Sequence, residues 1–307
     1  MFSKDDPGTQ VFAMQAELAE VIEHRTRGRF DCSTDVNNLS LFRREAQAAP
    51  NLCLVEPSIV LVARGKKRLV VGGDGYVYDT QHFLLTSLDI PANSEVVEAS
   101  AEEPCVGLTL KLDLRLLAEL IAQSGISPSA ARSPATSVGV GSITPALLEP
   151  ILRLVRLLDE PAACPILAPL IERETHYRLL MCEASQRLWQ IAAVGSQSHR
   201  IARAVDWLKL NYRQPLRIEA LAALVQMSSS SLHHHFRQLT AMSPLQYQKW
   251  LRLNEARRLM LSDGTDAASA AFEVGYESPS QFSRDYSRLF GSPPRRDVSG
   301  LRAKMLA

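Results

Sequence analysis

A two-helix pattern occurs twice in the last third of this chain, and the duplication restricts the possible folds more than any other feature. The copies span residues 221–244 and 270–294. Val225 matches Val274 at an offset of 49, and after the turn the offset becomes 50 because one residue, Glu277, is inserted. Each copy therefore predicts a helix, a tight turn and a second helix, the geometry that sets a helix into the major groove of DNA.

The second copy has the clearer turn. Gly275 stands where a helix would end in a left-handed residue, which costs glycine little. Ser278 and Pro279 then supply an N-cap and a first-position proline for the next helix. The first copy has Gln226 at the position of Gly275, and this difference weakens its turn signature.

The second helix of each copy has one apolar and one polar face. The apolar residues repeat at i, i+4 and i+7 and are Leu232, Phe236 and Leu239 in the first copy and Phe282, Tyr286 and Leu289 in the second. The opposite faces carry short polar groups, histidines and arginines, which suit base edges and phosphates. The predicted DNA-binding residues are Ser230, His233, His234 and Arg237 in the first copy, and Ser280, Gln281, Ser283 and Arg284 in the second.

The segment between the copies, residues 243–263, is predicted to be one continuous helix. About 18 helical residues span roughly 27 Å, at about 1.5 Å per residue. This length is close to the helical repeat of DNA, about 34 Å, and DNA bending would supply part of the difference. One chain is therefore expected to engage two successive major grooves. The residues available for packing are Leu245, Leu251, Leu253, Ala256, Leu259 and Met260.

Charge divides the chain in a way that its net value of +1 conceals. Residues 199–307 hold 16 Lys and Arg against 9 Asp and Glu, whereas residues 1–198 hold 18 against 24. A basic C-terminal part suits a polyanionic partner, and an acidic N-terminal part does not. Together with the repeated motif, this balance indicates double-stranded DNA as a partner of residues 196–307.

The N-terminal part has the pattern of a small β-structure with helices around it. Residues 9–24 have helical spacing, and residues 39–112 contain seven short segments rich in β-branched residues, which predict a sandwich or barrel. The sequence at 72–75, Gly-Gly-Asp-Gly, is a hairpin signal. Asp113 is a predicted N-cap for the helix that follows. Residues 124–142, rich in Ser, Gly, Ala and Pro, are expected to form a loose loop.

These patterns predict an α+β chain with two domains. Residues 1–195 form a sensor or dimerisation domain, with a cupin-like barrel or sandwich over about 39–112 and helices over about 113–194. Residues 196–307 form an all-α DNA-binding domain, with helix-turn-helix units at about 217–240 and 266–290 joined by a long helix. The wide apolar faces of the helices after residue 143 either pack on the barrel or form a dimer seam. Both alternatives stay open.

Five cysteines, odd in number and without a C-x-x-C pair, argue against a disulfide framework and for a reducing compartment. The chain start lacks the pattern of a secretory signal, and no apolar run is long enough for a bilayer, so a cytoplasmic location without a membrane partner is expected. Cys53 and Cys105 each lie near the start of a predicted strand. A redox-sensing thiol there would need a depressed pKa, which the positive charges of the basic cluster at 64–68 could provide. Cysteine is more often buried as an inert packing residue, so that interpretation is favoured.

A barrel of this size also raises the alternative of a metal-dependent enzyme of the cupin type. Such sites usually need two histidines close together on one strand with further ligands nearby, and His82 stands alone in its region. The run 233–235 of three histidines cannot converge on one ion, because neighbours on a helix point about 100° apart. We therefore expect no catalytic residue, metal or cofactor, and no effector-binding residue is assigned.

Two parts of the chain resemble a known protein family. GYESPSQFSRDYSRLFGSPPRR, preceded by SPLQYQKWLRLNEARRLML, resembles the DNA-binding domain of AraC/XylS transcription regulators, over about residues 199–302. A looser resemblance over about 39–185 is to the barrel domain of one branch of that family. The resemblance implies promoter binding through both units and an N-terminal domain that senses a signal or dimerises. It also places base contacts at Ser230, His233, His234, Ser280, Ser283 and Arg284, with Pro279 at a further such position.

We therefore predict a sequence-specific regulator, an activator as most members of the family are, that forms a homodimer, contacts RNA polymerase and responds to a small-molecule or redox effector. Two rival functions remain: a barrel enzyme with a DNA-binding tail, which would bind metal and turn over substrate, and an architectural DNA-binding protein, which would bind all sequences nearly equally.

Overall fold

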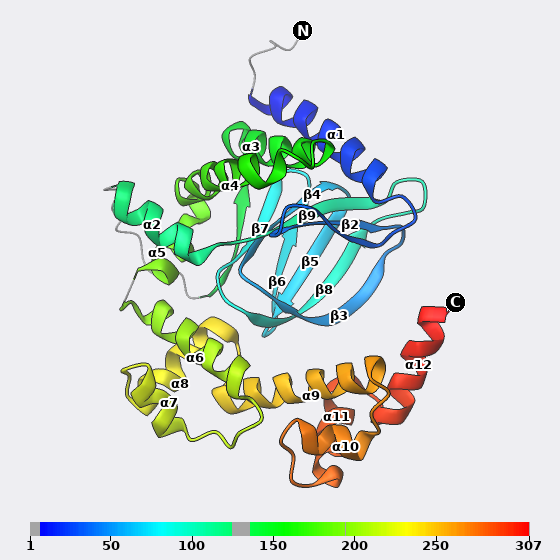
Figure 1. Cartoon of the computed structure of the whole chain (residues 1–307), viewed down its shortest axis with the longest axis vertical. Helices are drawn as coiled ribbons and strands as arrows, with labels where there is room; N and C mark the ends of the chain where they lie inside the picture. The colour runs from blue at the N-terminus through cyan, green and yellow to red at the C-terminus, as the bar shows by residue number, and fades with distance from the viewer. Residues whose placement is uncertain (1–6, 125–135, 194, 307) are drawn as a thin grey trace. The chain divides into compact units, whose positions relative to one another are not determined.

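The computed structural model describes residues 7–124, 136–193 and 195–306. The chain divides into two units, Met1–His199 with Gln238–Ala241 and Arg200–Arg237 with Met242–Ala307. The first unit combines β-sheets with helices, and the second consists of helices (Figure 1). The predicted α+β class is confirmed.

Two antiparallel sheets form a sandwich in the first unit. One has six strands in the order β1-β2-β9-β4-β7-β10, and the other has four in the order β3-β8-β5-β6. Alternate residues of the strands face the space between the sheets, as the period of two in a strand requires. The strands are β1 (Asp31–Ser33), β2 (Leu39–Arg44), β3 (Ala48–Val55), β4 (Ser58–Arg64), β5 (Lys66–Val71), β6 (Asp74–Tyr78), β7 (His82–Thr86), β8 (Ile90–Glu98), β9 (Cys105–Lys111) and β10 (Val138–Ser142).

The hairpin predicted at residues 72–75 joins β5 to β6. Val71 pairs with Asp74, so the loop consists of Gly72 and Gly73 alone. Both have positive φ, 61° and 114°, in a region that favours glycine. The prediction from the glycine-rich turn is confirmed, because a two-residue hairpin loop of this kind needs positive φ at both positions.

Of the loop predicted over residues 124–142, residues 125–135 lie outside the described part of the chain. The prediction is wrong at its end, where residues 138–142 form β10 and pair with β7. The glycines that made this segment look like a loop are required by close packing. A Cβ on Gly141 would lie 2.5 Å from the ring of Phe83, and a Cβ on Gly139 would lie 2.5 Å from the guanidinium of Arg187. Sequence composition alone therefore pointed to the wrong structure here.

The placement of the cysteines also corrects an expectation. Cys105 begins β9 as predicted, but Cys53 lies near the end of β3, because that strand starts at Ala48. The five cysteines are free. Burial raises the pKa of both Cys53 and Cys105, so neither thiol has the depressed pKa that a redox sensor needs.

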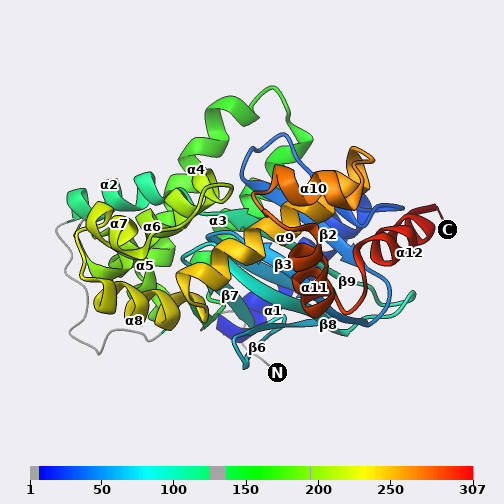
Figure 2. The same cartoon turned by 90° about the horizontal axis from the view of Figure 1, so that it is seen from below.

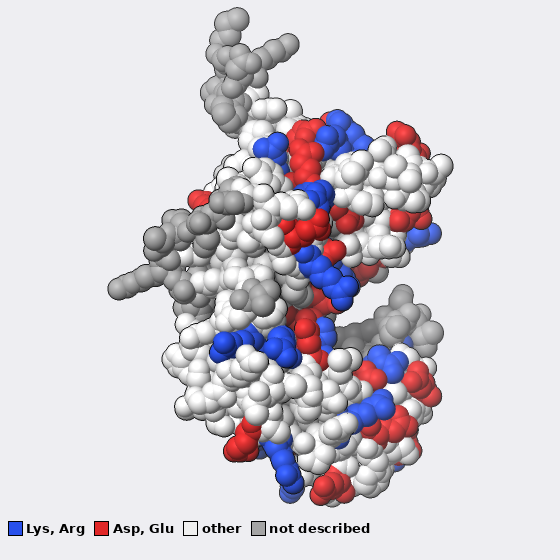
Figure 3. Space-filling view, turned by 60° about the vertical axis from the view of Figure 1, so that its left-hand side comes forward, with Lys and Arg blue, Asp and Glu red and all other residues white. Residues whose placement is uncertain are grey.

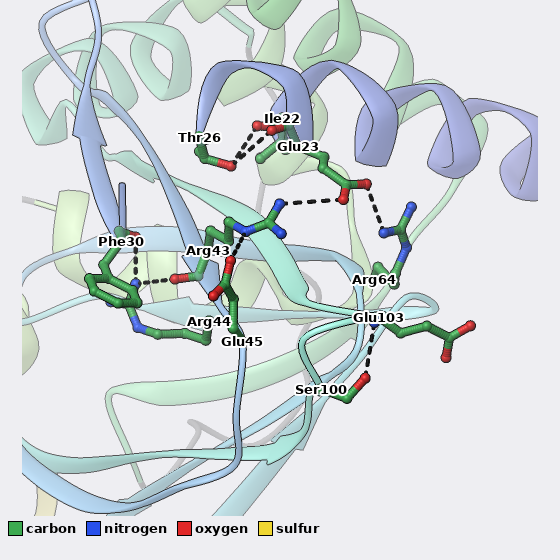
Figure 4. Close-up of polar contacts among 10 residues, drawn as sticks. All are labelled: Ile22, Glu23, Thr26, Phe30, Arg43, Arg44, Glu45, Arg64, Ser100 and Glu103. Atoms are coloured by element: carbon green, nitrogen blue, oxygen red, sulfur yellow. Dashed lines mark hydrogen bonds and ion pairs between the residues drawn. The ribbon is translucent and has the colours of Figure 1, made fainter. Parts of the chain in front are cut away.

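Helix α1 packs against the six-stranded sheet. Its apolar residues Leu18 and Ile22 are fully buried in the core, as the helical spacing of residues 9–24 predicted. On the neighbouring face, the Glu23 carboxylate accepts hydrogen bonds from Arg64 (2.9 Å) and Arg43 (3.3 Å), which come from two strands of that sheet (Figure 4). The bond from Arg64 is the main reason why the pKa of Glu23 is lowered, so α1 is attached through an ionised carboxylate.

The remaining helices of the first unit contribute to the same core as α1. Asp113 caps the helix after β9, as predicted, through bonds from the backbone N–H groups of Arg115 and Leu116. Buried His176 accepts from the Asp113 N–H (2.9 Å) through Nε2 and donates to the Glu172 carbonyl (2.7 Å) through Nδ1. The α-helices are α1 (Pro7–Arg25), α2 (Leu114–Ser124), α3 (Pro145–Arg156), α4 (Cys164–Leu180) and α5 (Gln186–Ala192).

The two apolar helices after residue 143 differ in what their faces contact. The apolar residues of α3 are buried in the core of the first unit, so the packing alternative holds for that helix. Helix α4 buries Leu179 and Leu180 but leaves a row of apolar side chains exposed around its outer face. This row consists of Ile166, Leu167, Leu170, Tyr177 and Met181.

The second unit contains seven helices in the described part of the chain. They are α6 (Gln197–Asn211), α7 (Ile218–Leu224), α8 (Ser229–Thr240), α9 (Pro244–Ser262), α10 (Ala267–Glu273), α11 (Pro279–Phe290) and α12 (Pro294–Leu306). Figures 1 and 2 show α6–α8 at one end of α9 and α10–α12 at the other. Of the helices described in either unit, none has the length and apolar character to cross a membrane.

Candidate nucleic-acid interface

Two helix-turn-helix units, α7–α8 and α10–α11, have turns with the same hydrogen bonds. The Met227 N–H donates to the Ala222 carbonyl at 2.9 Å, and the Tyr276 N–H donates to the Ala271 carbonyl at 2.9 Å. These pairs are related by the offset of 49 seen in the sequence. The duplication is therefore one of backbone geometry and not only of sequence.

Both turns depend on one residue in the left-handed region. Gly275 has a φ of 88°, and Gln226 has a φ of 57° at the equivalent position. The left-handed conformation costs a residue with a Cβ about 1–2 kcal/mol. The first copy thus keeps the same turn in spite of the glutamine, and it bears a local cost that the second copy avoids.

Each second helix begins at a serine cap. The Ser278 side chain accepts from the Gln281 N–H at 3.4 Å and Pro279 occupies the first helical position, which confirms the predicted start of α11. Ser228 accepts from the Ser231 N–H at 3.2 Å in the first copy.

The predicted faces of α8 and α11 are found as expected. Leu232, Phe236, Phe282 and Tyr286 are fully buried, and Leu239 and Leu289 pack at the edge of the cores. The proposed DNA-binding side chains lie on the opposite faces. Seven are exposed, namely Ser230, His233, His234, Arg237, Ser280, Gln281 and Arg284, and Ser283 is half-buried.

The two arginines of this set are free to bind a ligand. Within the described residues, neither Arg237 nor Arg284 has a hydrogen bond or an ion pair to another side chain or carbonyl. A guanidinium without a protein partner retains the planar, bidentate geometry that suits the N7 and O6 acceptors of guanine or a phosphate.

The three consecutive histidines do not converge. His233 and His234 are exposed, whereas His235 is half-buried and packs edge-to-face with His234 at 4.9 Å between ring centres. No group of three potential His, Cys, Asp or Glu ligands is assembled in the part of the chain that the structure describes. His82, the other candidate, bonds Asp79 at 2.9 Å.

The long connector begins at a capping box. Ser243 accepts from the Gln246 N–H, and the Gln246 side chain in turn accepts from the Ser243 N–H at 2.9 Å. At about 1.5 Å per residue, the 19 residues of α9 span about 28 Å. One expected packing residue is misplaced: Leu245 is half exposed and lines an open hollow instead of packing into a core.

Arg252 on α9 joins segments from both halves of the second unit. Its guanidinium donates to the carbonyls of Tyr212 (2.6 Å), Arg213 (3.1 Å) and Gln214 (3.0 Å), all between α6 and α7, and to Gly275 (2.9 Å) in the second turn. Gly275 is in direct contact with the same segment, because a Cβ built on it would lie 2.2 Å from the Arg213 carbonyl oxygen. The second turn is thus held against the segment between α6 and α7.

The first turn has a simpler brace. Arg200 on α6 donates to the carbonyl of Gln226 at 2.8 Å, as Arg252 does to the carbonyl of Gly275. Neither arginine is predicted from the sequence to have this role. The only available signal is an arginine on the helix that precedes each unit, because the side-chain pattern does not encode the carbonyls that each arginine contacts.

A second polar network supports α11 from behind. Arg257 of α9 makes a bidentate pair with Asp297 of α12, at 2.8 and 2.9 Å, and the hydroxyl of Tyr286 donates to the same carboxylate at 2.8 Å. The pair is largely buried. The hydroxyl group of Tyr286, which belongs to the apolar face of α11, therefore has a hydrogen-bond acceptor.

Charge on the surface is mixed. On the face drawn in Figure 3, basic and acidic side chains are interspersed and form no continuous field of one sign. Some basic residues beyond position 199 are paired with carboxylates, such as Arg258 with Glu255 and Lys249 with Asp285.

Family comparisons agree with this geometry. The model for the N-terminus of AraC-type transcriptional regulators matches residues 35–187, and a helix-turn-helix domain model matches residues 221–298. The transcriptional activator RhaS of Pectobacterium carotovorum is 25% identical over 122 residues, or 40% of this chain and 44% of RhaS. The regulator ArgR of Pseudomonas aeruginosa is 27% identical over 144 residues, or 47% and 44%. The chain thus spans a little under half the length of these curated relatives.

Solved structures show the same fold. ToxT of Vibrio cholerae, bound to a naphthalenyl butenoic acid, covers 85% of this chain and 97% of its own, with a TM-score of 0.57 and 11% identity. ToxT bound to an unsaturated fatty acid covers 85% and 93%, with a TM-score of 0.52 and 11% identity. With one family model on each unit and two matching helix-turn-helix turns, this chain belongs to the AraC/XylS family of transcription regulators.

Proposed function

We propose that this regulator activates transcription from promoters on which each chain reads two successive major grooves. The main support for the proposal is that α8 and α11 each have an exposed polar face and each follow a turn with the same hydrogen bonds. Because α9 spans about 28 Å, it suits two reading heads about one helical repeat of DNA apart.

The proposed contacts divide by position along each helix. Ser230, His233 and His234 at the front of α8 face base edges in one groove, and Arg237, a turn further on, meets phosphate. The base contacts of α11 are assigned to Ser280, Gln281, Ser283 and Arg284. Arg284 has the largest share in sequence choice, because a free guanidinium pairs in a bidentate manner with guanine.

Residues 1–195 are proposed as the sensor and dimerisation domain, and residues 196–307 as the DNA-binding domain. The exposed apolar row of α4 supports dimerisation, since five large side chains on one outer helix face are costly to leave in water. A second copy of this chain is the proposed occupant. ToxT, by the description of one of its structures, binds an unsaturated fatty acid, and a small-molecule response is proposed here for the sandwich.

Activation requires a partner besides DNA. RNA polymerase is the proposed partner, in the cytoplasm, because the curated relatives include activators such as RhaS. We propose no catalytic step for this chain.

Hydroxyl-radical footprinting of the full chain on its selected site tests the proposal. Two protected segments of DNA backbone per protomer, about one helical turn apart, are expected. Protection of one segment per protomer would refute two-headed reading, and equal affinity for selected and random duplex would favour an architectural role.

A further inference from the structure

Four basic residues lie close together in the sequence at Arg64, Lys66, Lys67 and Arg68, and three of them are neutralised at the surface. Arg64 pairs with Glu23 at 2.9 Å. Lys66 pairs with Glu98 at 2.5 Å, and Arg68 pairs with Glu95 at 2.7 Å. These three are ordinary solvated ion pairs, and they leave Lys67 as the exception.

Lys67 faces the interior of the sandwich. It shares the inward face of β5 with Leu69 and Val71, both buried, whereas Arg68 between them is exposed. The ammonium reaches across to the opposite sheet and lies 4.2 Å from the ring centre of Phe42 on β2. A lysine thus occupies a position where the strand alternation calls for an apolar residue.

No counter-charge meets this ammonium. Among residues 7–124, 136–193 and 195–306, no carboxylate lies within ion-pair distance of Lys67, and the nearby Asp31 is paired with Arg44 at 2.7 Å. Its neighbours Cys53 and Cys105 are neutral, because burial raises the pKa of both thiols. Burial also lowers the pKa of Lys67, which is the sign of a cation that lacks compensation.

A cavity of about 270 Å³ opens beside Lys67 inside the sandwich. Its wall combines apolar residues such as Leu54, Val60 and Leu84 with the hydroxyl groups of residues from both sheets. The hydroxyl-bearing residues are Ser40, Ser58, Tyr78, Ser94 and Thr109. The wall also includes Glu56 and a second lysine, Lys111, which pair with each other at 2.6 Å.

We propose that this cavity binds a small organic carboxylate, whose anionic head pairs with Lys67 and whose apolar body rests on Leu54, Val60 and Leu84. The hydroxyl groups of Tyr78, Ser94 and Thr109 supply donors to the carboxylate oxygens, because those of Ser40 and Ser58 already donate to backbone carbonyls. Tyr78 remains a neutral donor, because burial raises the pKa of its hydroxyl. A bound carboxylate supplies the counter-charge that the protein lacks, and this distinguishes it from a neutral ligand of the same shape.

Binding itself is a property of the sandwich, and its effect on transcription rests on the function proposed above. The probes are hexanoate and benzoate, with hexanamide and benzamide as uncharged matches of the same shape. Thermal melting and calorimetric titration of the full chain measure the response. The carboxylates are expected to raise the melting temperature and the amides are not.

Two variants and a control locate the effect. Lys67→Met and Lys67→Gln remove the charge inside the sandwich and are expected to weaken carboxylate binding by about 10- to 100-fold, the range for a hydrogen bond to a charged group. Lys66→Met removes the adjacent, surface-paired charge and is expected to leave binding unchanged. Lys67→Met is also expected to raise the melting temperature of the unliganded chain, since a functional charge is held at the expense of stability.

Several outcomes overturn the inference. These are no melting shift with either carboxylate, an equal shift with the amides, or full binding by both Lys67 variants. A Lys67→Met protein that melts lower than the wild type would assign the lysine a structural role. DNA binding by the same preparations is measured alongside, so that a chain which binds its promoter but no carboxylate refutes this inference alone.

Discussion

The two helix-turn-helix units have the same turn but support it in different ways. Gln226 is exposed and bears its positive φ with a side chain present, whereas Gly275 has no room for a Cβ beside the Arg213 carbonyl. At the first turn Arg200 and Arg203 bond the carbonyls of Gln226 and Leu224. At the second, Arg252 bonds the Gly275 carbonyl and three carbonyls between α6 and α7. Both turns are therefore held by arginines from a preceding helix, but only the second is also packed closely against another segment of the same unit.

The largest expected effect breaks the second turn. Gly275→Ala combines a left-handed residue with a Cβ, at about 1–2 kcal/mol, with overpacking against Arg213, at about 1–3 kcal/mol. The total loss of about 2–5 kcal/mol is expected in α10 and α11. Amide hydrogen exchange measures it, with α7 and α8 as the internal reference. Unchanged protection of α10 and α11 would contradict the close contact.

The next prediction concerns the spacing between the two helix-turn-helix units. Arg252→Gln removes bonds from one guanidinium to four carbonyls, and a loss of about 2–3 kcal/mol in binding to the complete site is expected, because a bond to a charged group contributes about 1.5–3 kcal/mol. Affinity for a DNA that carries only one of the two groove segments is expected to stay the same. Gel-shift titration on both DNAs measures the difference.

Arg258→Gln is the matched control, because this arginine on the same helix is exposed and pairs with Glu255 and Asp263. An equal loss on complete and single-segment DNA for Arg252→Gln would mean that the arginine acts on one head only, and not on their spacing.

A smaller effect distinguishes base reading from phosphate binding. Arg284→Ala is expected to cost about 1–3 kcal/mol on the preferred site and to relax the choice at one base position. Arg237→Ala is expected to weaken binding to all sequences and to reduce the salt slope by about 1. Titration at several salt concentrations on specific and random DNA compares them. Equal losses on both DNAs for Arg284→Ala would remove its assigned role.

The smallest expected effect relieves the first turn. Gln226→Gly removes the cost of the left-handed residue, about 1–2 kcal/mol, and adds the chain entropy of glycine, about 0.4–1 kcal/mol. A gain of about 0.5–1 kcal/mol is expected in urea unfolding. Destabilisation would show that the Gln226 side chain itself stabilises the turn, and the contrast between the copies would then be weaker than the backbone suggests.

The features that could be predicted from the sequence are those that neighbouring residues determine. The turn at Gly275, the cap at Ser278 and the hairpin at Gly72 and Gly73 depend on conformations that a few neighbours set, and each is confirmed. The outward set on α8 and α11 follows from helical period alone, so its exposure was predictable while its contacts with DNA stay predictions.

The features that sequence reasoning missed depend on distant residues. The glycines of β10 resemble a loop until the ring of Phe83 lies against them. In the run KKRLVV, two adjacent lysines leave the strand phase ambiguous, so the inward position of Lys67 was hidden. The carbonyls that Arg252 contacts belong to the backbone, which gives no sequence signal at all.

The central claim is that one chain reads two adjacent grooves at a spacing set by α9, and altered DNA spacing tests it most directly. Insertion of five base pairs between the two protected segments rotates one segment by about half a turn of DNA. The affinity of the wild-type protein for this DNA is predicted to fall to its affinity for a DNA with a single segment. The insertion is expected to cause little further loss of affinity in the Arg252→Gln protein. Wild-type affinity that is unchanged by the insertion would contradict the account.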